Sequence, residues 1–213
     1  MRYAVFSDAH GRLRHIDAVL NEADRLGVAG VISIGDLIDV KLSKTFQSKI
    51  RLPVAEVADH VSEVANLTAH CVRIRGNQEE RFLRVARVDE LTTSEAMLFL
   101  GPFEFNLPGY RFAHGHQFNW CHINECLRYP EVGMNVETLF HGHRHRRQIL
   151  RRPRCARASD RYEEVDIVLN RPIELLSSEQ TLVDVGPLFV DGVWVLFDAE
   201  AGTVTYLRSD SPS

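Results

Sequence analysis

Short apolar runs alternate with amphipathic segments over the first third of the chain. The pattern predicts buried strands at residues 2–6, 28–34 and 71–75, and helices at residues 12–26 and 54–67. Gly27 is placed to end the first of these helices. Strands that are apolar along their whole length are typical of parallel sheets covered on both faces. The pattern therefore predicts β-loop-α units that form a parallel sheet with helices on its faces.

The pattern changes after residue 78. It predicts helices at residues 79–90 and 93–100, and strands at residues 110–113, 136–140, 181–185, 193–197 and 203–207. Residues 199–202 are suited to join the last two strands in a hairpin. Early βα units followed by late strands predict an α/β fold. We expect a four-layer α-β-β-α sandwich, with two mixed sheets face to face between flanking helices. The 213 residues are enough for one large domain, 1–213.

Residues 151–180 do not follow this pattern. We interpret them as an insertion or long loop with a strand at 165–169. The overlapping segment 144–157 contains seven arginines. They can form a basic patch for phosphate-rich substrates or nucleic acid, or they can lie on a solvated surface loop. No aromatic residue alternates with these arginines, as it would on a base-stacking surface, so we favour the surface loop.

Composition indicates the cellular compartment and the classes of partner of the protein more than its activity. Hydrophobic residues make up 45% and charged residues 25%, and the net charge is -4, so nothing global favours nucleic acid or membrane as a partner. No apolar run approaches the ~20 residues of a membrane-spanning helix, and no basic leader precedes the first strand. Four cysteines with uneven spacing fit neither a disulfide framework nor a zinc site: Cys71, Cys121, Cys126 and Cys155. We expect reduced thiols in a soluble cytoplasmic protein of undetermined oligomeric state.

Five short segments place metal-binding side chains at the ends of apolar runs. They are Asp8-Ala9-His10, Gly35-Asp36, Gly76-Asn77, His114-Gly115-His116 and Gly142-His143-Arg144-His145. Strand ends of an open α/β sheet meet at one edge, where ligands usually bind. In extended chain, residues i and i+2 point the same way, so both Asp8 and His10 can reach one site. Carboxylates, an amide oxygen and imidazoles, with no thiol, are typical ligands of two divalent metal ions.

Each segment alone has a simpler interpretation. Asp36 can cap a helix or a turn, and Asn77 can occupy a left-handed turn after Gly76. A single histidine is more often a packed or surface residue than a metal ligand. The prediction of a metal site therefore depends on all five segments falling at strand ends in this order.

In this order the segments resemble the motifs of the calcineurin-like metallophosphoesterases, specifically their small single-domain, phosphodiesterase-type members. The motifs are DAH at 8–10, GDLID at 35–39, GNQE at 76–79, HGH at 114–116 and GHRH at 142–145. The resemblance covers about residues 1–150, and the late strands fit the family's second sheet more loosely. It implies a dinuclear-metal-dependent phosphoesterase, an enzyme that hydrolyses a small nucleotide or another phosphate ester. The nucleophile would be a water or hydroxide between the two ions.

The resemblance also implies the ligands of both ions. It assigns Asp8, His10 and His145 to the first ion, Asn77, His114 and His143 to the second, and Asp36 to both as a bridge. Mixed oxygen and nitrogen ligands suit manganese, iron, zinc or nickel, and the family resemblance favours manganese.

The third segment departs from the family pattern at Gln78. Many members carry a histidine there, and in the larger phosphatases it pairs with the acid that corresponds to Asp39 and protonates the leaving group. Glutamine cannot transfer a proton at pH 7, so we expect a preference for good leaving groups or another acid. We retain Asn77, Gln78 and His116 as candidate catalytic residues, with His122 as a further neighbour.

Three aromatic residues flank the histidine segments: Phe118, Trp120 and Phe140. They can form an apolar wall for a nucleobase, or they can pack in the core. We predict core packing for Phe140 and leave both interpretations open for Phe118 and Trp120.

Two further classes of function compete with a small-molecule phosphoesterase. A catalytically weak scaffold that binds a partner protein would be expected to lack metal ligands, whereas here every expected ligand position is filled. A nucleic-acid phosphoesterase would use the arginines of 144–157, and its binding would weaken steeply with salt. The negative net charge and the small size favour a small phosphate-ester substrate.

Overall fold

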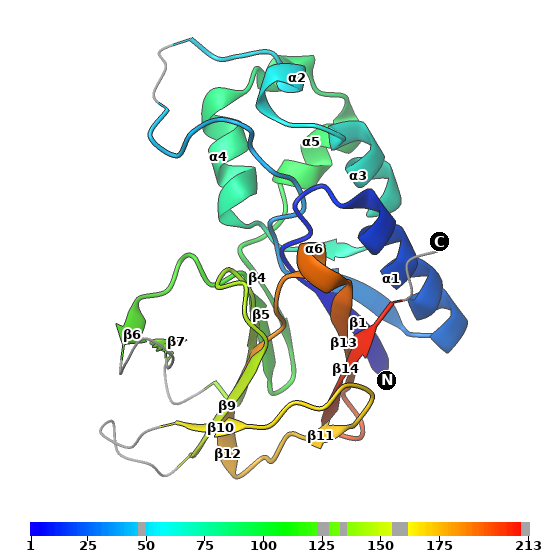
Figure 1. The fold of residues 1–213 in the computed structure, drawn as a ribbon, viewed down its shortest axis with the longest axis vertical. Coiled ribbons are helices and arrows are strands. Elements are labelled where there is room, and N and C mark those ends of the chain that lie inside the picture. Colours follow the sequence, from blue (N-terminus) through cyan, green and yellow to red (C-terminus); the bar gives the residue numbers. More distant parts are fainter. Residues whose placement is uncertain (47–49, 123–127, 133–135, 155–161, 210–213) are drawn as a thin grey trace.

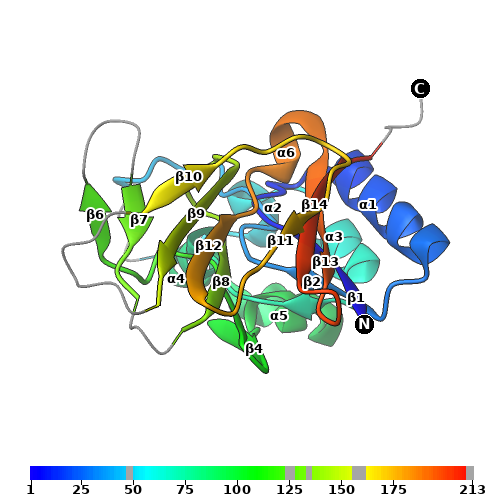
Figure 2. The same cartoon turned by 90° about the horizontal axis from the view of Figure 1, so that it is seen from below.

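The computed structural model describes residues 1–46, 50–122, 128–132, 136–154 and 162–209. Two six-stranded mixed sheets form its centre, and α1 (Leu13–Leu26) lies on the outer side of the first sheet (Figure 1 and Figure 2). The predicted α/β class, with two mixed sheets and flanking helices, is confirmed.

The first sheet is built around the N-terminal strands. Its spatial order is β11 (Ile173–Glu174), β14 (Thr203–Arg208), β13 (Val193–Asp198), β1 (Arg2–Phe6), β2 (Gly30–Ser33) and β3 (Val72–Arg73). As predicted, β1, β2 and β3 are parallel, and β13 and β14 form a hairpin. The carboxyl ends of β1, β2 and β3 therefore meet at one edge.

The second sheet is built from the later strands. Its spatial order is β10 (Glu163–Val165), β9 (Gln148–Pro153), β12 (Glu179–Asp184), β8 (Thr138–His141), β5 (Tyr110–Ala113) and β4 (Glu104–Leu107). β5, β8 and β12 are parallel, so their carboxyl ends also share an edge. A separate two-stranded hairpin consists of β6 (Trp120–His122) and β7 (Arg128–Pro130).

The remaining helices gather beyond the ends of the sheets. They are α2 (Val54–Val57), α3 (Val61–Leu67), α4 (Asn77–Val85), the 3-10 helix η1 (Val88–Glu90), α5 (Thr93–Phe99) and α6 (Leu188–Asp191). Figure 1 shows α2 to α5 as one group above the two sheets. α1 ends at Gly27, whose φ of 60° is the left-handed conformation expected of a glycine cap.

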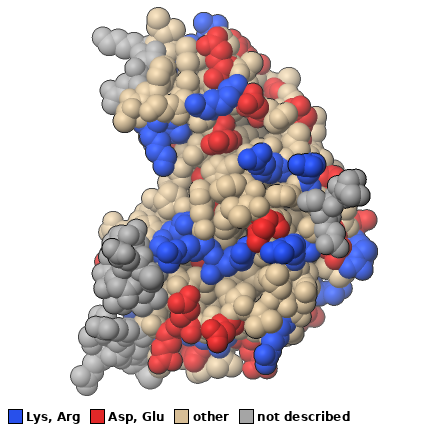
Figure 3. All heavy atoms as spheres, in the orientation of Figure 1, with Lys and Arg blue, Asp and Glu red and all other residues tan. Residues whose placement is uncertain are grey.

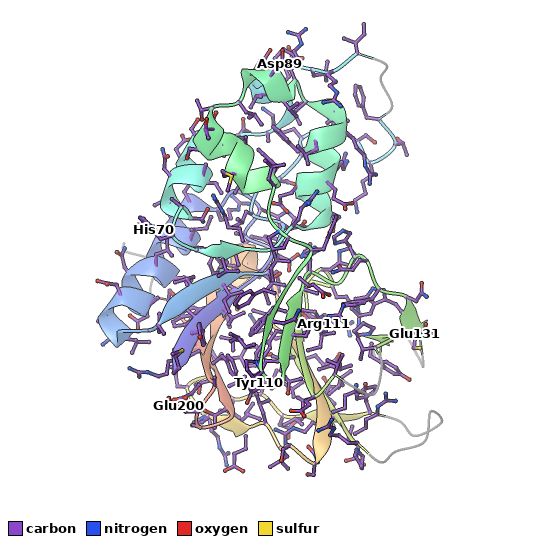
Figure 4. All side chains as sticks on the ribbon, turned by 180° about the vertical axis from the view of Figure 1, so that it is seen from behind. His70, Asp89, Tyr110, Arg111, Glu131 and Glu200 are labelled. Atoms are coloured by element: carbon purple, nitrogen blue, oxygen red, sulfur yellow. The ribbon has the colours of Figure 1, made fainter. Side chains whose placement is uncertain are left out.

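Aromatic side chains fill the space between the two sheets. The rings of Phe112 and Phe140 stack at 4.6 Å, and the ring of Phe197 from the first sheet lies 4.9 Å from Phe140. Tyr110 lies at the same layer, with its ring 4.6 Å from that of Phe197 (Figure 4). Full burial of each such side chain contributes about 1.5–3 kcal/mol. Phe140 therefore belongs to the core, as predicted.

Several predicted bounds are wrong. Residues 54–67 form two helices because Ala58 is extended and bridges to Val40, and because His60 has a φ of 58°. The helix predicted at 79–90 begins at Asn77 and ends at Val85. The strand predicted at 165–169 lies at Glu163–Val165. The sequence pattern missed β4, β6, β7, β9, β11 and α6.

The structure can be compared with the expectations about membrane-spanning helices and cysteine thiols. No helix among the described residues is long and apolar enough to cross a bilayer. Cys71 and Cys121 carry free thiols, and Cys126 and Cys155 lie outside the described residues.

Candidate metal centre

Polar side chains from both sheets converge at the edge where the parallel strands end. The predicted ligands follow β1, β2, β3, β5 and β8: Asp8, His10, Asp36, Asn77, His114, His143 and His145. Two sets of these have ligand atoms within 4.8 Å of one another: Asp8, His10 and His145, and Asp8, Asp36 and His114. The molecule is hollowed where α4 faces the β6–β7 hairpin (Figure 3).

The first set surrounds one oxygen of Asp8. His145 Nε2 lies 3.3 Å from Asp8 Oδ1, and His10 Nε2 lies 3.9 Å from the same oxygen. The two imidazole Nε2 atoms are 3.3 Å apart. Two nitrogens and one carboxylate oxygen at these separations can converge on a single ion.

The second set surrounds Asn77 and His114. His114 Nε2 lies 3.1 Å from Asn77 Oδ1, and His143 Nδ1 lies 2.8 Å from it. Asp36 Oδ2 is 3.4 Å from His114 Nε2 and 3.9 Å from His10 Nε2. The Asp36 carboxylate therefore lies between the two sets.

The hydrogen bonds within this cluster leave some of its donor atoms available to a metal ion. Asp8 Oδ1 is buried and accepts no hydrogen bond among the described residues, whereas Asp8 Oδ2 accepts from Ser7 Oγ at 2.6 Å and His143 N at 3.1 Å. An unsatisfied buried carboxylate oxygen is costly unless a cation faces it. His114 Nδ1 lies 2.7 Å from the carbonyl oxygen of Ile34, which directs Nε2 toward Asp36 as in metal-binding histidines.

Left-handed backbone presents these side chains. Five of the predicted ligands have positive φ: Asp8 at 52°, His10 at 45°, Asp36 at 52°, His143 at 71° and His145 at 55°. The expectation that residues i and i+2 share a site because the chain is extended is therefore wrong. Backbone hydrogen bonds hold the first two residues in place, from Asp8 N to Gly35 O at 3.1 Å and from His10 N to Asp36 O at 2.9 Å. Such conformations cost about 1–3 kcal/mol each and cluster at functional sites.

Two glycines permit the close approach of the loops. A Cβ at Gly142 would clash with the side chains of Ser7 and Asp8, and a Cβ at Gly76 would clash with Asp36. These contacts explain why the fifth segment can approach the first, and the third can approach the second, only with glycine at positions 142 and 76.

Glu79 accepts hydrogen bonds from the backbone of the loop that carries Asp36. The sequence pattern predicted no role for it. Its Oε2 accepts from Asp36 N at 2.9 Å and Gly76 N at 2.8 Å, and its Oε1 accepts from Leu37 N at 2.8 Å and Ile38 N at 3.4 Å. The side chain is 1% exposed. Its position three residues after Gly76, where a capping glutamate is expected, is the signal that could have identified it.

His114 balances the carboxylate charge of the centre. Burial alone would lower the pKa of His114, but the charge and the hydrogen bond of Asp36 raise it to about 10. Burial would raise the pKa of Asp36, but the charge on His114 outweighs this and lowers it to about 2. Burial and the charge on His114 lower the pKa of His143 to about 4. A divalent ion held by His114 Nε2 would take the place of this proton.

Gln78 ties α4 to the loop after β2. It is 7% exposed, and its Oε1 accepts the backbone N–H of Val40 at 3.2 Å. The carboxylate of Asp39 lies 3.6 Å from His10 Nδ1. Gln78 thus has a structural partner of its own, and Asp39 is positioned to orient His10.

His116 lies beside the second set of ligands. Its ring is 5.4 Å from that of His114 and 6.2 Å from that of His143, and its Nε2 lies 3.6 Å from Glu80 Oε2. Burial and the charge on His114 lower the pKa of His116, which favours the neutral form of its ring. The side chain of His122 lies outside the described part of the chain.

Trp120 borders the centre on the hairpin side. Its Nε1 donates to the carbonyl oxygen of Gly115 at 3.1 Å, and its ring lies 6.4 Å from that of His143. The guanidinium of Arg144 lies 5.4 Å from the indole centroid. Trp120 is half-buried at the edge of the centre, whereas Phe118 packs against the hydrophobic cluster on the outer face of the second sheet.

We expect divalent metal ions to stabilise the protein against heat. An ion at 100 times its Kd contributes about 2.7 kcal/mol. Since 1 kcal/mol shifts the midpoint by about 2–4 °C at this chain length, we expect a rise of roughly 5–10 °C. Differential scanning fluorimetry in EDTA and then in excess manganese, iron, zinc or nickel measures this shift. An unchanged midpoint with all four ions would contradict a metal centre.

Comparisons with known proteins identify both the family and the fold. The family model described as calcineurin-like phosphoesterase superfamily domain matches residues 1–159. No curated protein matches the chain. Among solved structures, a metallophosphoesterase from Sphaerobacter thermophilus is similar, with a TM-score of 0.65 and 16% identity over 100% of this chain and 90% of that chain. A protein from Thermus thermophilus has a TM-score of 0.50 and 14% identity, over 98% of this chain and 99% of that chain. A hypothetical protein from Pyrococcus horikoshii has a TM-score of 0.50 and 13% identity, over 100% of this chain and 89% of that chain.

Proposed function

Because the chain belongs to the calcineurin-like phosphoesterase superfamily, we propose that it is a phosphodiesterase that hydrolyses small phosphate esters at a centre for two divalent metal ions. The observation that carries this proposal is the position of Asp36. Its carboxylate lies 3.9 Å from a histidine of the first set and 3.4 Å from a histidine of the second. A carboxylate between two such sets is suited to hold two ions together.

We assign Asp8, His10 and His145 to one ion, Asn77, His114 and His143 to the other, and Asp36 to both. Two bound ions would activate water and neutralise charge on the phosphate. The donor set of carboxylate, amide and imidazole suits manganese, iron, zinc or nickel, with manganese as our first choice. Within the chain, Ile34 O faces His114 Nδ1 and leaves Nε2 for a metal ion, and the Asp39 carboxylate lies near His10 Nδ1.

The pairing of the arginines supports a small substrate over nucleic acid. Four arginines of segment 144–157 have partners: Arg147 with Asp191, Arg151 with Glu179, Arg152 with Gln180 and Arg154 with Glu137. Three of these partners are acids, and an arginine paired with an acid within the protein offers less charge to a phosphate backbone. A catalytically weak scaffold is the remaining alternative, and the complete ligand set speaks against it.

Hydrolysis of bis-p-nitrophenyl phosphate and of the monoester p-nitrophenyl phosphate tests the proposal. EDTA-treated protein, reconstituted with each ion in turn, is expected to turn over the diester faster than the monoester, and only with metal. Metal content by mass spectrometry accompanies each assay. Bound metal without turnover would favour the scaffold, and absence of both metal and turnover would overturn the enzyme assignment.

We further propose that His116, rather than Gln78, contacts the leaving group. A neutral imidazole can donate an N–H to the departing oxygen, and this help matters most for poor leaving groups. In His116→Ala, kcat/KM is expected to fall roughly 10-fold more for methyl phenyl phosphate than for methyl p-nitrophenyl phosphate. His116→Gln, which keeps an N–H donor, is expected to recover part of the loss. An equal loss on both esters would refute this role.

A further inference from the structure

A second pocket lies beside the candidate metal centre, where α1 begins next to α6. It has a volume of about 310 Å³, and its lining includes Arg12, Arg14 and Phe189. Phe189 forms a wall shared with the metal centre, since its ring lies 5.0 Å from that of His10 and 5.2 Å from that of His145. The pocket and the first set of ligands are therefore neighbours.

This pocket is basic, although the net charge of the chain is -4. Its lining contains Arg12, Arg14, His15 and His60, and no acidic residue from the described part of the chain. Arg12 and Arg14 are exposed, and neither side chain has an ion-pair or hydrogen-bond partner among the described residues. His60 is paired with Glu63 at 3.3 Å. The two arginines are thus the cations available to a ligand.

One further polar atom at the pocket lacks a partner. His15 lies on the first turn of α1, and its Nδ1 is buried without a hydrogen-bond partner among the described residues. Arg12 is the N-cap of α1 but provides no capping hydrogen bond, and the first turn contains no acidic side chain. The positive end of this 14-residue helix therefore adds to the charge of the arginines.

We propose that this pocket binds a second phosphate group carried by the substrate. The inference rests on the proposed function and names its substrate class: esters that bear a further phosphate or phosphonate beyond the one that is hydrolysed. Guanidinium groups match phosphate oxygens in a bidentate geometry, and a helix N-terminus favours an anion. Because Phe189 borders both the pocket and the metal centre, a substrate that spans the two would pass its ring.

Two diesters with the same leaving group test the substrate class: ethyl p-nitrophenyl phosphate and 2-phosphonoethyl p-nitrophenyl phosphate. The wild type is expected to show a kcat/KM about 10-fold higher for the phosphonoethyl ester. In the Arg12→Gln/Arg14→Gln double variant, this ratio is expected to fall to about 1. Arg171→Gln is the matched control, because Arg171 is also exposed and without a side-chain partner among the described residues, and lies outside the pocket. A double variant that keeps the wild-type ratio would overturn the inference.

Binding of inorganic phosphate to the metal-free protein gives a readout that needs no turnover. A ³¹P NMR titration in EDTA is expected to show roughly 10-fold weaker binding in the double variant than in the wild type and Arg171→Gln. Equal phosphate binding by the wild type, the double variant and Arg171→Gln, or no binding by the wild type, would overturn the proposal that this pocket binds phosphate. Arginine-dependent phosphate binding without ester preference would identify free phosphate as the ligand and overturn the substrate role. Arginine-dependent binding with neither ester hydrolysed supports the pocket, and then the proposed function is what fails.

Discussion

Asp36→Asn is expected to abolish metal-dependent phosphodiester hydrolysis, with a fall in kcat/KM of about 1,000-fold or more. The carboxylate lies between the two sets of ligands, 3.9 Å from His10 Nε2 and 3.4 Å from His114 Nε2. The amide keeps an oxygen that can accept from Gln78 N, which Asp36 Oδ1 does at 2.9 Å, but it removes the charge that would hold the two proposed ions. Loss of several kcal/mol of charge stabilisation corresponds to this factor.

Metal stoichiometry separates this effect from misfolding. Wild type reconstituted with manganese is expected to hold two ions, and Asp36→Asn one or none, with an unchanged circular dichroism spectrum. Asp39→Asn is the matched comparison in the same loop, since Asp39 is 63% exposed and contacts only one ligand, at 3.6 Å from His10 Nδ1. Its kcat/KM is expected to fall by less than about 10-fold. Two bound ions together with near-wild-type turnover in Asp36→Asn would refute the bridging position.

The convergence of the candidate ligands could be predicted from sequence because these residues stand directly after buried strands. The apolar runs that end at Phe6, Ile34 and Ala113 predict where each strand stops, and Asp8, Asp36 and His114 follow within two residues. Parallel strands bring these positions to one edge whatever the details of the loops. The local apolar pattern and one rule of sheet topology were therefore sufficient to predict that these side chains lie close together.

The conformation of the loops could not be predicted, because it depends on contacts between distant segments. The left-handed backbone of Asp8 and His10 is held by carbonyl groups of Gly35 and Asp36, which belong to another strand end. The break in the helix predicted at 54–67 depends on the bridge between Val40 and Ala58. Nothing near these positions in the sequence records such partners.

β9 was missed for a similar reason. Its sequence QILRRP contains two adjacent arginines, which is typical of a surface loop. In the second sheet, however, Arg152 is 9% exposed because its Nε donates to Gln180 on the neighbouring strand at 2.8 Å. The polar strand is stable in the sheet only through cross-strand partners that local pattern cannot reveal.

Glu79→Gln is expected to destabilise the metal-free protein by about 2–4 kcal/mol, because the amide nitrogen must face two backbone N–H groups that now donate to a carboxylate oxygen. Glu79 Oε2 accepts from Asp36 N and Gly76 N, and Oε1 accepts from Leu37 N and Ile38 N. These bonds fix the loop that carries Asp36, so metal affinity is also expected to fall roughly 10–100-fold. Urea unfolding in EDTA measures the first effect, and calorimetric titration with manganese measures the second.

Glu95→Gln is the matched control for this substitution. Glu95 occupies the same position in α5 that Glu79 occupies in α4, and it accepts from Thr92 N at 2.7 Å. Glu95 is partly exposed and distant in sequence from the candidate metal ligands, so water can replace the lost acceptor, and we expect a cost of about 0.5–1 kcal/mol with unchanged metal affinity. If Glu79 served only as a helix cap, the two variants would lose similar stability and both would bind manganese as the wild type does. A large loss of metal affinity in Glu79→Gln alone would instead show that the cap of α4 also fixes the position of the Asp36 carboxylate.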